Sequence, residues 1–144
     1  PSEKDLTDTE AAINHAIELG IRDITVYGGI GGRLDHTLGN VGLLEKYIGK
    51  LDHLEFMDGK NSMQLLDSES CNSILLTHTS AYRYFSLVSL DSIADGVSIT
   101  GAKYNLDNAS ISRASTLCIS NEIILNQAHI SVHHGKVLLI RSGD

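Results

Sequence analysis

The chain has 144 residues, of which 42% are hydrophobic and 20% are charged, and it contains 13 glycines and one proline. This composition is typical of a globular protein that is long enough to bury a core. The formal net charge is −7 and no basic patch rich in aromatic residues is present, which argues against nucleic acid as a partner. No apolar run approaches the roughly 18 residues that a bilayer span needs, so we also expect no membrane as a partner.

Cysteines and histidines give little sign of cross-links or of zinc. Cys71 and Cys118 are too few for a disulfide framework and neither has a Cys-x-x-Cys partner, so we expect a reduced, cytoplasmic protein in which both are core residues. Among the seven histidines, His133 and His134 are adjacent and would point to opposite faces of a strand. We therefore expect no zinc site.

The first expected element is a helix. Thr7 and Glu10 stand three positions apart and form a capping box. Apolar residues then recur at helical spacing as far as Gly20, a residue type that commonly follows a helix; they are Ala12, Ile13, Ala16 and Ile17. We expect a helix over residues 8–19 and a strand over residues 21–27.

A second helix and a hairpin complete this part of the chain. Apolar residues at helical spacing predict a helix over residues 35–47, which Gly49 ends. Two short apolar runs, 54–57 and 63–66, flank an Asp-Gly pair that favours a turn, so we expect two strands joined as a hairpin. Helices and strands joined by short links are typical of a parallel sheet with helices packed on it.

The rest of the chain has no helical period. Short segments rich in β-branched and aromatic residues are separated by Gly, Asn, Asp and Ser; they span 72–78, 82–90, 97–106, 109–119, 128–134 and 136–141. This series predicts an antiparallel sandwich. We therefore expect the fold class α/β followed by all-β, with a partial three-layer α/β domain and parallel sheet over residues 1–68, and an antiparallel β-sandwich over residues 69–144.

A glycine-rich stretch follows the first expected strand. Its four glycines, Gly28, Gly29, Gly31 and Gly32, leave the backbone with little side-chain cover. In open α/β sheets, ligands bind where a strand ends and a helix begins. Neither the P-loop nor the dinucleotide-binding glycine spacing is present, and the alternative interpretation is a simple tight connection.

Charged residues on either side make this stretch a more specific candidate. Arg33 can clamp a phosphate through two hydrogen bonds, and the carboxylate of Asp35 can hold a divalent cation. Asp5 and Asp8 add carboxylates at the start of the first helix, where the alternative explanation is a favourable interaction with the helix dipole.

A second candidate site lies in the β-rich part. Tyr104 can stack on a flat heteroaromatic ring, and Ser120 and Asn121 can hydrogen-bond the edge of that ring. The alternative is a tyrosine that packs in the core or across strands, beside an asparagine turn. The residues alone leave both interpretations open.

Four motifs, in this order, resemble the thiamine pyrophosphokinase family. They read Lys4-Asp5-x-Thr7-Asp8-x-Glu10, Gly29-x-Gly31-Gly32-Arg33-x-Asp35-His36-x-Leu38-x-Asn40, Thr100-Gly101-x-Lys103-Tyr104-x-Leu106 and Ser120-Asn121-Glu122. The Gly-Gly-Arg-x-Asp-His element is the most specific of them. The resemblance implies an α/β catalytic domain followed by a β-sandwich, a homodimer with active sites between subunits, and Mg²⁺-dependent transfer of diphosphate from ATP to thiamine.

The resemblance also implies roles for individual residues. The catalytic residues would be Asp8, Arg33 and Asp35, and Asp5 and Asp8 would bind Mg²⁺, although the roles within this acidic set are interchangeable. The ATP phosphates would be bound around the glycines, by Gly29, Gly31, Gly32, Arg33, His36 and Asn40. Thiamine would be bound from the partner subunit, by Tyr104, Ser120 and Asn121.

One family motif does not occur in this chain. The acidic Gly-Asp-x-Asp-Ser element, which the family uses for Mg²⁺ and phosphate, is absent, and the sequence begins at Pro1 without an initiator Met. We therefore expect the C-terminal two-thirds of such an enzyme, which by itself can be inactive. The alternatives are a non-catalytic dimeric module that binds thiamine or another heterocycle, and a metal hydrolase that uses Asp35 and His36.

Overall fold

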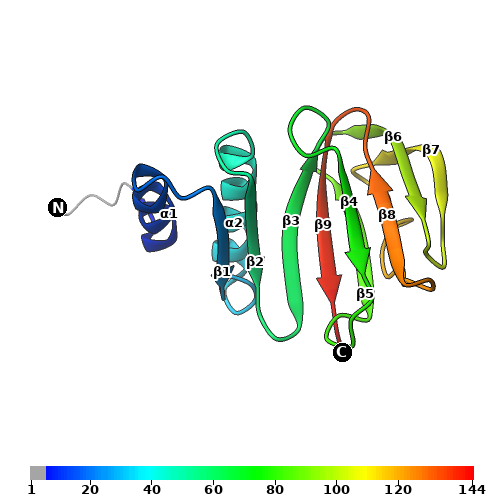
Figure 1. Cartoon of the computed structure of the whole chain (residues 1–144), viewed down its shortest axis with the longest axis horizontal. Helices are drawn as coiled ribbons and strands as arrows, with labels where there is room; N and C mark the ends of the chain where they lie inside the picture. The colour runs from blue at the N-terminus through cyan, green and yellow to red at the C-terminus, as the bar shows by residue number, and fades with distance from the viewer. Residues whose placement is uncertain (1–5) are drawn as a thin grey trace.

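The computed structural model describes residues 6–144, which form two helices and two β-sheets (Figure 1). The elements follow in the order α1 (Asp8–Glu18), β1 (Asp23–Tyr27), α2 (Leu34–Tyr47), β2 (His53–Met57), β3 (Asn61–Asp67), β4 (Ser73–Thr77), β5 (Tyr84–Ser89), β6 (Ile93–Thr100), β7 (Leu106–Ser112), β8 (Gln127–Ser131) and β9 (Lys136–Ser142). Both predicted helices are confirmed to within one residue at each end.

Helix α1 begins as its sequence predicts. The N–H of Glu10 donates to the Thr7 hydroxyl at 3.2 Å, which satisfies one of the free amides of the first turn. The helix ends at Glu18, with Leu19 as its C-cap, and Gly20 follows with a φ of +85°. The side chain of Ile13 is buried and anchors the helix to the core beneath it.

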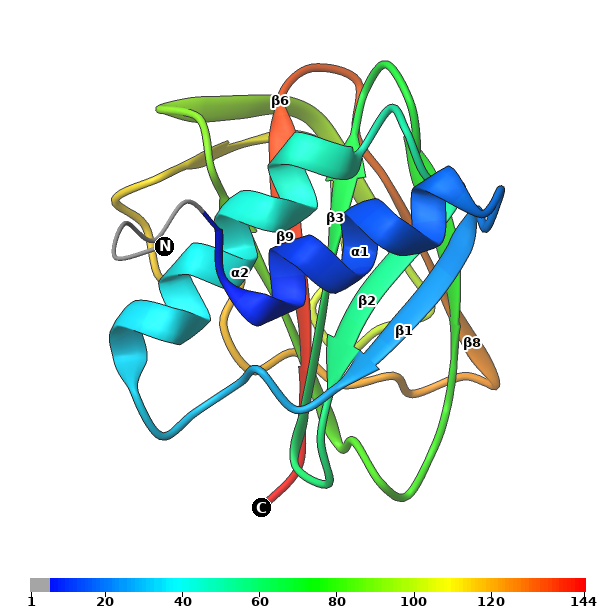
Figure 2. The same cartoon turned by 90° about the vertical axis from the view of Figure 1, so that its left-hand side faces the viewer.

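The two helices lie against each other and cover the same face of the parallel strands (Figure 2). Near the end of α2, Lys46 pairs with Glu10, and the Tyr47 hydroxyl donates to the side chain of Asn14. Under the helices lies a hydrophobic core of Ile13, Leu43, Leu44, Tyr47, Leu51, Leu54, Phe56, Met63, Leu65 and Leu138. This core fixes α2, and with it the start of α2, relative to the sheet.

The first sheet has five strands in the order β1-β2-β3-β9-β5. Strands β1 and β2 are parallel, whereas β2-β3, β3-β9 and β9-β5 are antiparallel. The predicted hairpin of β2 and β3 is therefore confirmed, and the sheet that contains the parallel pair is mixed. Strands β5 and β9 reach this sheet from the second half of the chain.

The same sheet separates two hydrophobic cores. In β9, Val137 and Leu139 belong to the core of the β-sandwich, and Leu138 belongs to the core under the helices. Successive side chains of a strand point to opposite faces, so one uninterrupted apolar run serves both cores. The helices thus cover one face of the sheet, and the second sheet packs against the other face over β5 and β9.

The second sheet is antiparallel and has the strand order β4-β8-β6-β7. With it, the predicted class of α/β followed by all-β is confirmed. The strand expected over 109–119 ends earlier, at Ser112, and the residues after it form a loop with two isolated bridges, Phe85 to Asn121 and Ala102 to Ile123. Strands β5 and β9 follow residue 69 in the chain but belong to the first sheet. The predicted division into domains between residues 68 and 69 stays a prediction.

Neither helix in residues 6–144 has the length and apolar composition that a membrane span requires. Both cysteines are free, with Cys118 buried and Cys71 partly buried. Burial raises the pKa of both thiols, which keeps them protonated and suits their predicted place in the core.

Candidate active site

The glycine-rich loop, residues 28–33, leaves the sheet at the carboxyl end of the parallel pair. The N–H of Gly28 donates to the carbonyl of Met57 at 2.8 Å, which extends the pairing of β1 with β2 by one bond. The four glycines then take positive φ values of 95°, 76°, 77° and 61°, a backbone region that residues with a Cβ atom rarely adopt. The loop therefore depends on glycine for its shape and delivers the chain to the start of α2.

Arg33 and Asp35 face each other where the loop ends and α2 begins. The Arg33 Nη2 donates to Asp35 Oδ2 at 2.6 Å, and Nε donates to Oδ1 at 3.2 Å. The guanidinium lowers the pKa of the Asp35 carboxyl from its ordinary value of 3.8, and the bond from the His36 N–H adds to this effect. The pair combines a guanidinium, a group that can bind phosphate, with a carboxylate that remains ionised at neutral pH.

The side chain of Asn40 lies under the loop. It is only 7% exposed, and its Nδ2 donates to the Gly29 carbonyl at 2.9 Å. The amide of Asn40 is thus already bonded to the protein. Its predicted contact with phosphate stays a prediction. Gly31 is also engaged, because its N–H donates to Thr37 Oγ1 at 3.0 Å. Gly32 and His36 are exposed beside it, and their predicted phosphate contacts stay predictions.

Thr37 was not among the predicted site residues. Its hydroxyl accepts the bond from Gly31 and lies 3.4 Å from the carbonyls of both Gly31 and Arg33. A signal for it does exist in the sequence, because Thr37 and Asn40 are three positions apart and so share one face of α2. That face meets the loop.

Asp8 is the first residue of α1 and lines a shallow apolar groove together with Ile24 and Val26 of β1. Val26 is two positions before the loop, so Asp8 lies near the carboxyl end of β1, where the loop starts. Among residues 6–144, no hydrogen bond or ion pair links Asp8 to Arg33 or Asp35. Asp5 lies outside the described residues, and the Mg²⁺ roles of both aspartates stay predictions.

The second candidate site presents an exposed ring on a fixed backbone. Tyr104 is 59% exposed, so it is not packed in the sandwich core. Its N–H donates to Asn121 Oδ1 at 3.0 Å, and its carbonyl accepts from Asn121 Nδ2 at 2.7 Å. Asn121 is 3% exposed and also accepts from the Glu122 N–H at 2.9 Å. The structure thus shows Asn121 holding the segment that carries Tyr104, and its contact with a ligand stays a prediction.

One cation lies beside the ring of Tyr104 and belongs to a small charged network. The Lys103 ammonium is 5.5 Å from the ring centre, and Glu122 pairs with Lys103 at 3.7 Å and with Arg83 at 3.1 Å. Ser120 is exposed and takes a φ of +63°, and its N–H donates to the hydroxyl of Ser86 at 3.0 Å. The ring, its cationic neighbour and Ser120 remain accessible to a flat ligand.

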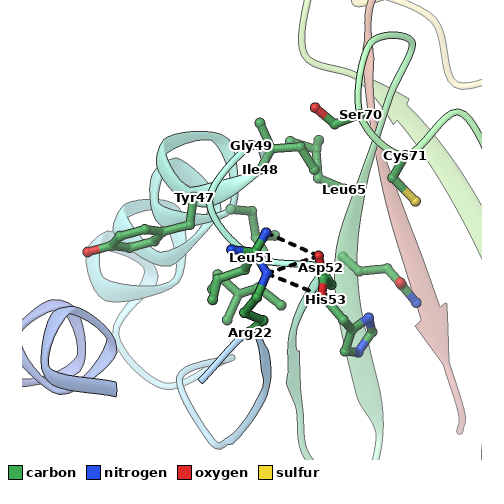
Figure 3. A pocket seen from close by; sticks show the side chains of 13 residues that line it. Arg22, Tyr47, Ile48, Gly49, Leu51, Asp52, His53, Leu65, Ser70 and Cys71 are labelled. Atoms are coloured by element: carbon green, nitrogen blue, oxygen red, sulfur yellow. Dashed lines mark hydrogen bonds and ion pairs between the residues drawn. The ribbon is translucent and has the colours of Figure 1, made fainter. Parts of the chain in front are cut away.

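A polar pocket of about 270 Å³ lies elsewhere, between the end of α2 and the start of β2 (Figure 3). Arg22 reaches across it and pairs with Asp52 at 3.2 Å, while the Arg22 carbonyl accepts the N–H groups of Asp52 and His53. These bonds tie the beginnings of β1 and β2 together. None of the predicted site residues lines this pocket, and we assign it a structural role.

Two sequence models of known domains match this chain. Residues 1–57 match the thiamin pyrophosphokinase catalytic domain, and residues 72–137 match the thiamin pyrophosphokinase vitamin B1 binding domain. The first range contains the glycine-rich loop and the Arg33–Asp35 pair, and the second contains Tyr104, Ser120 and Asn121. Both candidate sites therefore fall inside domains of one enzyme family.

Individual relatives agree with the domain matches. The thiamine pyrophosphokinase of Bacillus subtilis is 34% identical over 143 residues, which cover 99% of this chain and 65% of the relative. The crystal structure from that organism superposes with a TM-score of 0.89. The crystal structure of thiamin pyrophosphokinase from Geobacillus thermodenitrificans has a TM-score of 0.86 at 39% identity, and the match covers 99% of this chain and 64% of that one.

The chain thus spans about two-thirds of the length of these relatives, 65% and 64% in the two cases. Within that span the match is continuous across the α/β part and the sandwich, and it includes both candidate sites. From its sequence, its fold and its two matched domains, the chain belongs to the thiamine pyrophosphokinase family.

Proposed function

We propose that this chain carries the phosphate-binding and thiamine-binding parts of a thiamine pyrophosphokinase, which transfers diphosphate from ATP to thiamine and releases AMP. The observation that carries the proposal is the bidentate Arg33–Asp35 pair directly after a loop of positive-φ glycines. Exposed backbone amides and a guanidinium suit phosphate, and the neighbouring carboxylate suits a cation or a hydroxyl group.

The transfer requires the oxygen of the thiamine hydroxyl to form a bond to the β-phosphorus of ATP. The bond from that phosphorus to the oxygen that bridges to the α-phosphorus breaks, and AMP leaves with this oxygen. In-line transfer of this kind depends mainly on alignment and on neutralising phosphate charge. Arg33 and the loop amides would hold the phosphates, which reduces the charge that repels the incoming hydroxyl.

Asp35 is better suited to orient the hydroxyl or to hold a cation than to keep a proton. Because Arg33 lowers the pKa of its carboxyl, Asp35 is a weak base. It would accept a hydrogen bond from the hydroxyl of thiamine, whose proton passes on to water. Its carboxylate oxygens remain available as acceptors throughout the reaction.

We propose Mg²⁺ as the cation of this site. The residues that the structure describes contain no group of three or more His, Cys, Asp and Glu that could hold a metal. Mg²⁺ does not need one, because it binds through one or two carboxylates and completes its shell with water and substrate phosphates. Asp8 and Asp35 would supply these carboxylates, and Asp5 is a further candidate; the bound ion would reduce the charge on the phosphates.

Thiamine would stack on Tyr104 through its aminopyrimidine ring, with Ser120 at the ring edge. We propose that this site works in a homodimer, where the ring of one subunit approaches the glycine-rich loop of the other. Large exposed apolar side chains in the same region support such an interface; they are Tyr104, Leu117, Ile119, Ile124 and Leu125. The two free cysteines suit a cytoplasmic location.

Turnover tests the proposal directly. The intact gene product is incubated with thiamine and Mg·ATP, and AMP and thiamine diphosphate are measured. Equal amounts of both products would support the proposal. Binding of thiamine without any product would favour a non-catalytic module, and release of phosphate without thiamine would favour a hydrolase.

A further inference from the structure

Two side chains of α2 hold the glycine-rich loop from below. Asn40 donates to the Gly29 carbonyl at 2.9 Å, and Thr37 accepts the Gly31 N–H at 3.0 Å. They are one helical turn apart, so both point from the same face of the helix toward the loop. The core under the helices holds that face in place, since Leu43 and Leu44 are buried in it.

The packing at Gly29 shows how closely Asn40 fits the loop. A Cβ atom at Gly29 would lie 2.7 Å from Asn40 Nδ2 and 3.2 Å from the ring of Phe56, which is itself fully buried. The backbone therefore rests directly on these two side chains. Asn40 is 7% exposed and its Nδ2 already donates to the Gly29 carbonyl. These features suit a residue that holds the loop backbone better than one that contacts a ligand.

Hydrogen bonds within the protein also determine which loop amides are free for a ligand. The Gly28 N–H is bonded to Met57, and the Gly31 N–H is bonded to Thr37. Within residues 6–144, the N–H groups of Gly29, Ile30 and Gly32 have no hydrogen-bond partner. Successive amides of this kind in a glycine-rich turn form a concavity that attracts anions.

We propose that Thr37 and Asn40 are positioning residues that fix the loop in its phosphate-binding shape without touching the phosphate. This inference rests on the proposed function to the extent that the anion bound by the loop is the triphosphate of ATP. Thr37 fixes the loop at Gly31 and Asn40 fixes it at Gly29, so the free amides between and beside these points keep one arrangement. A loop released at either point would lose that arrangement before any ligand arrives.

Variants of similar size test the two bonds separately in the intact gene product. Thr37→Val removes the hydroxyl, Asn40→Asp replaces the donor with a carboxylate, and Thr37→Ser keeps the hydroxyl. Ser89→Ala is the matched control, because Ser89 is 1% exposed and its hydroxyl bonds the carbonyl of Asp91 at 2.8 Å, in a different part of the sheet.

We expect Thr37→Val and Asn40→Asp each to weaken the affinity for Mg·ATP by about tenfold, measured by calorimetry without thiamine. In turnover, the KM for ATP should rise by a similar factor while the KM for thiamine stays unchanged. Thr37→Ser and Ser89→Ala should behave as the parent does, even if Ser89→Ala lowers the melting temperature. An unchanged affinity for Mg·ATP in both Thr37→Val and Asn40→Asp would overturn the inference.

Amide exchange of the ligand-free chain gives a second measurement that involves no substrate. The Gly31 N–H should exchange faster with solvent in Thr37→Val than in the parent or in Thr37→Ser, and unchanged exchange would count against the bond. An intact gene product that binds Mg·ATP but yields no product contradicts the proposed function, and the affinities of the variants for Mg·ATP then still test the inference. An intact gene product that binds no Mg·ATP contradicts both.

Discussion

The glycine-rich loop and the Tyr104 segment are held in the same way but present different chemical groups. Each rests on a buried asparagine whose amide bonds the backbone of the site, Asn40 at Gly29 and Asn121 at Tyr104. The loop presents its own backbone, because four glycines leave it without side chains. The Tyr104 segment presents a ring that is 59% exposed.

This difference indicates how each site should respond to mutation. A site made of backbone should be damaged by adding atoms, since an added side chain covers the amides and strains positive φ angles. A site made of a ring should be damaged by removing atoms. In both sites the buried asparagine should affect binding through the shape of the backbone.

The largest effect is expected at the charged end of the glycine-rich loop. Asp35→Asn should lower kcat by on the order of 100-fold, because an amide neither holds a cation nor orients the hydroxyl as a carboxylate does. The measurement is turnover of thiamine with ATP across a range of Mg²⁺ concentrations. Asp23→Asn, at the opposite end of β1, is the control and should keep parental turnover. Near-normal turnover of Asp35→Asn with unchanged Mg²⁺ dependence would show that Asp35 has no such role.

Gly29→Ala should damage the loop by adding one methyl group. The new Cβ would meet Asn40 Nδ2 at 2.7 Å at a residue whose φ is +76°, so we expect a loss of about 1–3 kcal/mol in the free energy of unfolding. The KM for ATP should rise by about tenfold or more. Gly42→Ala is the control, because it has open space within α2 and should stabilise the helix by about 0.5–1 kcal/mol. Equal effects of the two changes on urea unfolding would contradict this account.

Asn121→Ala should destabilise the second site through its backbone. It leaves the N–H and the carbonyl of Tyr104 without their partner, which costs about 1–3 kcal/mol of folding free energy. The KM for thiamine should rise and the KM for ATP should not, in contrast to the loop variants. Denaturant unfolding and steady-state kinetics measure the two effects. A rise in the KM for ATP alone would show that Asn121 does not act on the binding of thiamine.

Tyr104→Ala should raise the KM for thiamine by about three- to tenfold, which corresponds to the loss of one stacking contact. The melting temperature should stay the same, because the ring is 59% exposed. Tyr104→Phe keeps the ring and should retain the parental KM. If Tyr104→Phe were as impaired as Tyr104→Ala, the hydroxyl rather than stacking would carry the interaction.

The smallest effect is expected in the titration of Asp35. Arg33 lowers the pKa of this carboxyl from 3.8, so the ionised form is favoured in the folded protein. Any stability from the pair is present above pH 3.8 and is lost as the pH falls through the lowered pKa. It should be slight because both side chains are exposed to water. In Arg33→Gln the carboxyl should titrate closer to 3.8 by NMR, and an unchanged midpoint would argue against the pair in solution.

Local patterns in the sequence predicted most of the elements. Both helices follow from apolar spacing and the capping box, and the hairpin follows from its Asp-Gly turn, because these signals lie within one element or its ends. The pairing of β5 and β9 with the first sheet was not predicted. One sign of it was readable, since the continuous apolar run 137–140 is typical of a strand that is buried on both faces.

The candidate site residues were named from sequence, but the roles of two of them depend on burial. Asn40 and Asn121 were both predicted to contact a ligand, and the structure shows each of them buried and bonded to the backbone of its own site. Thr37 was missed because its bond to the Gly31 N–H depends on where the fold places the loop. A residue type shows which bonds a side chain can make, and its partner is decided by what the fold brings near it.

The sequence alone determined the family, the order of the helical and β-rich parts, and the position of both candidate sites, since these depend on residue identity and short-range spacing. Only the tertiary structure decided which strands share a sheet and which polar groups are already satisfied within the protein. Pairing of distant segments and burial of their side chains come from packing over the whole chain, which no local window of sequence contains.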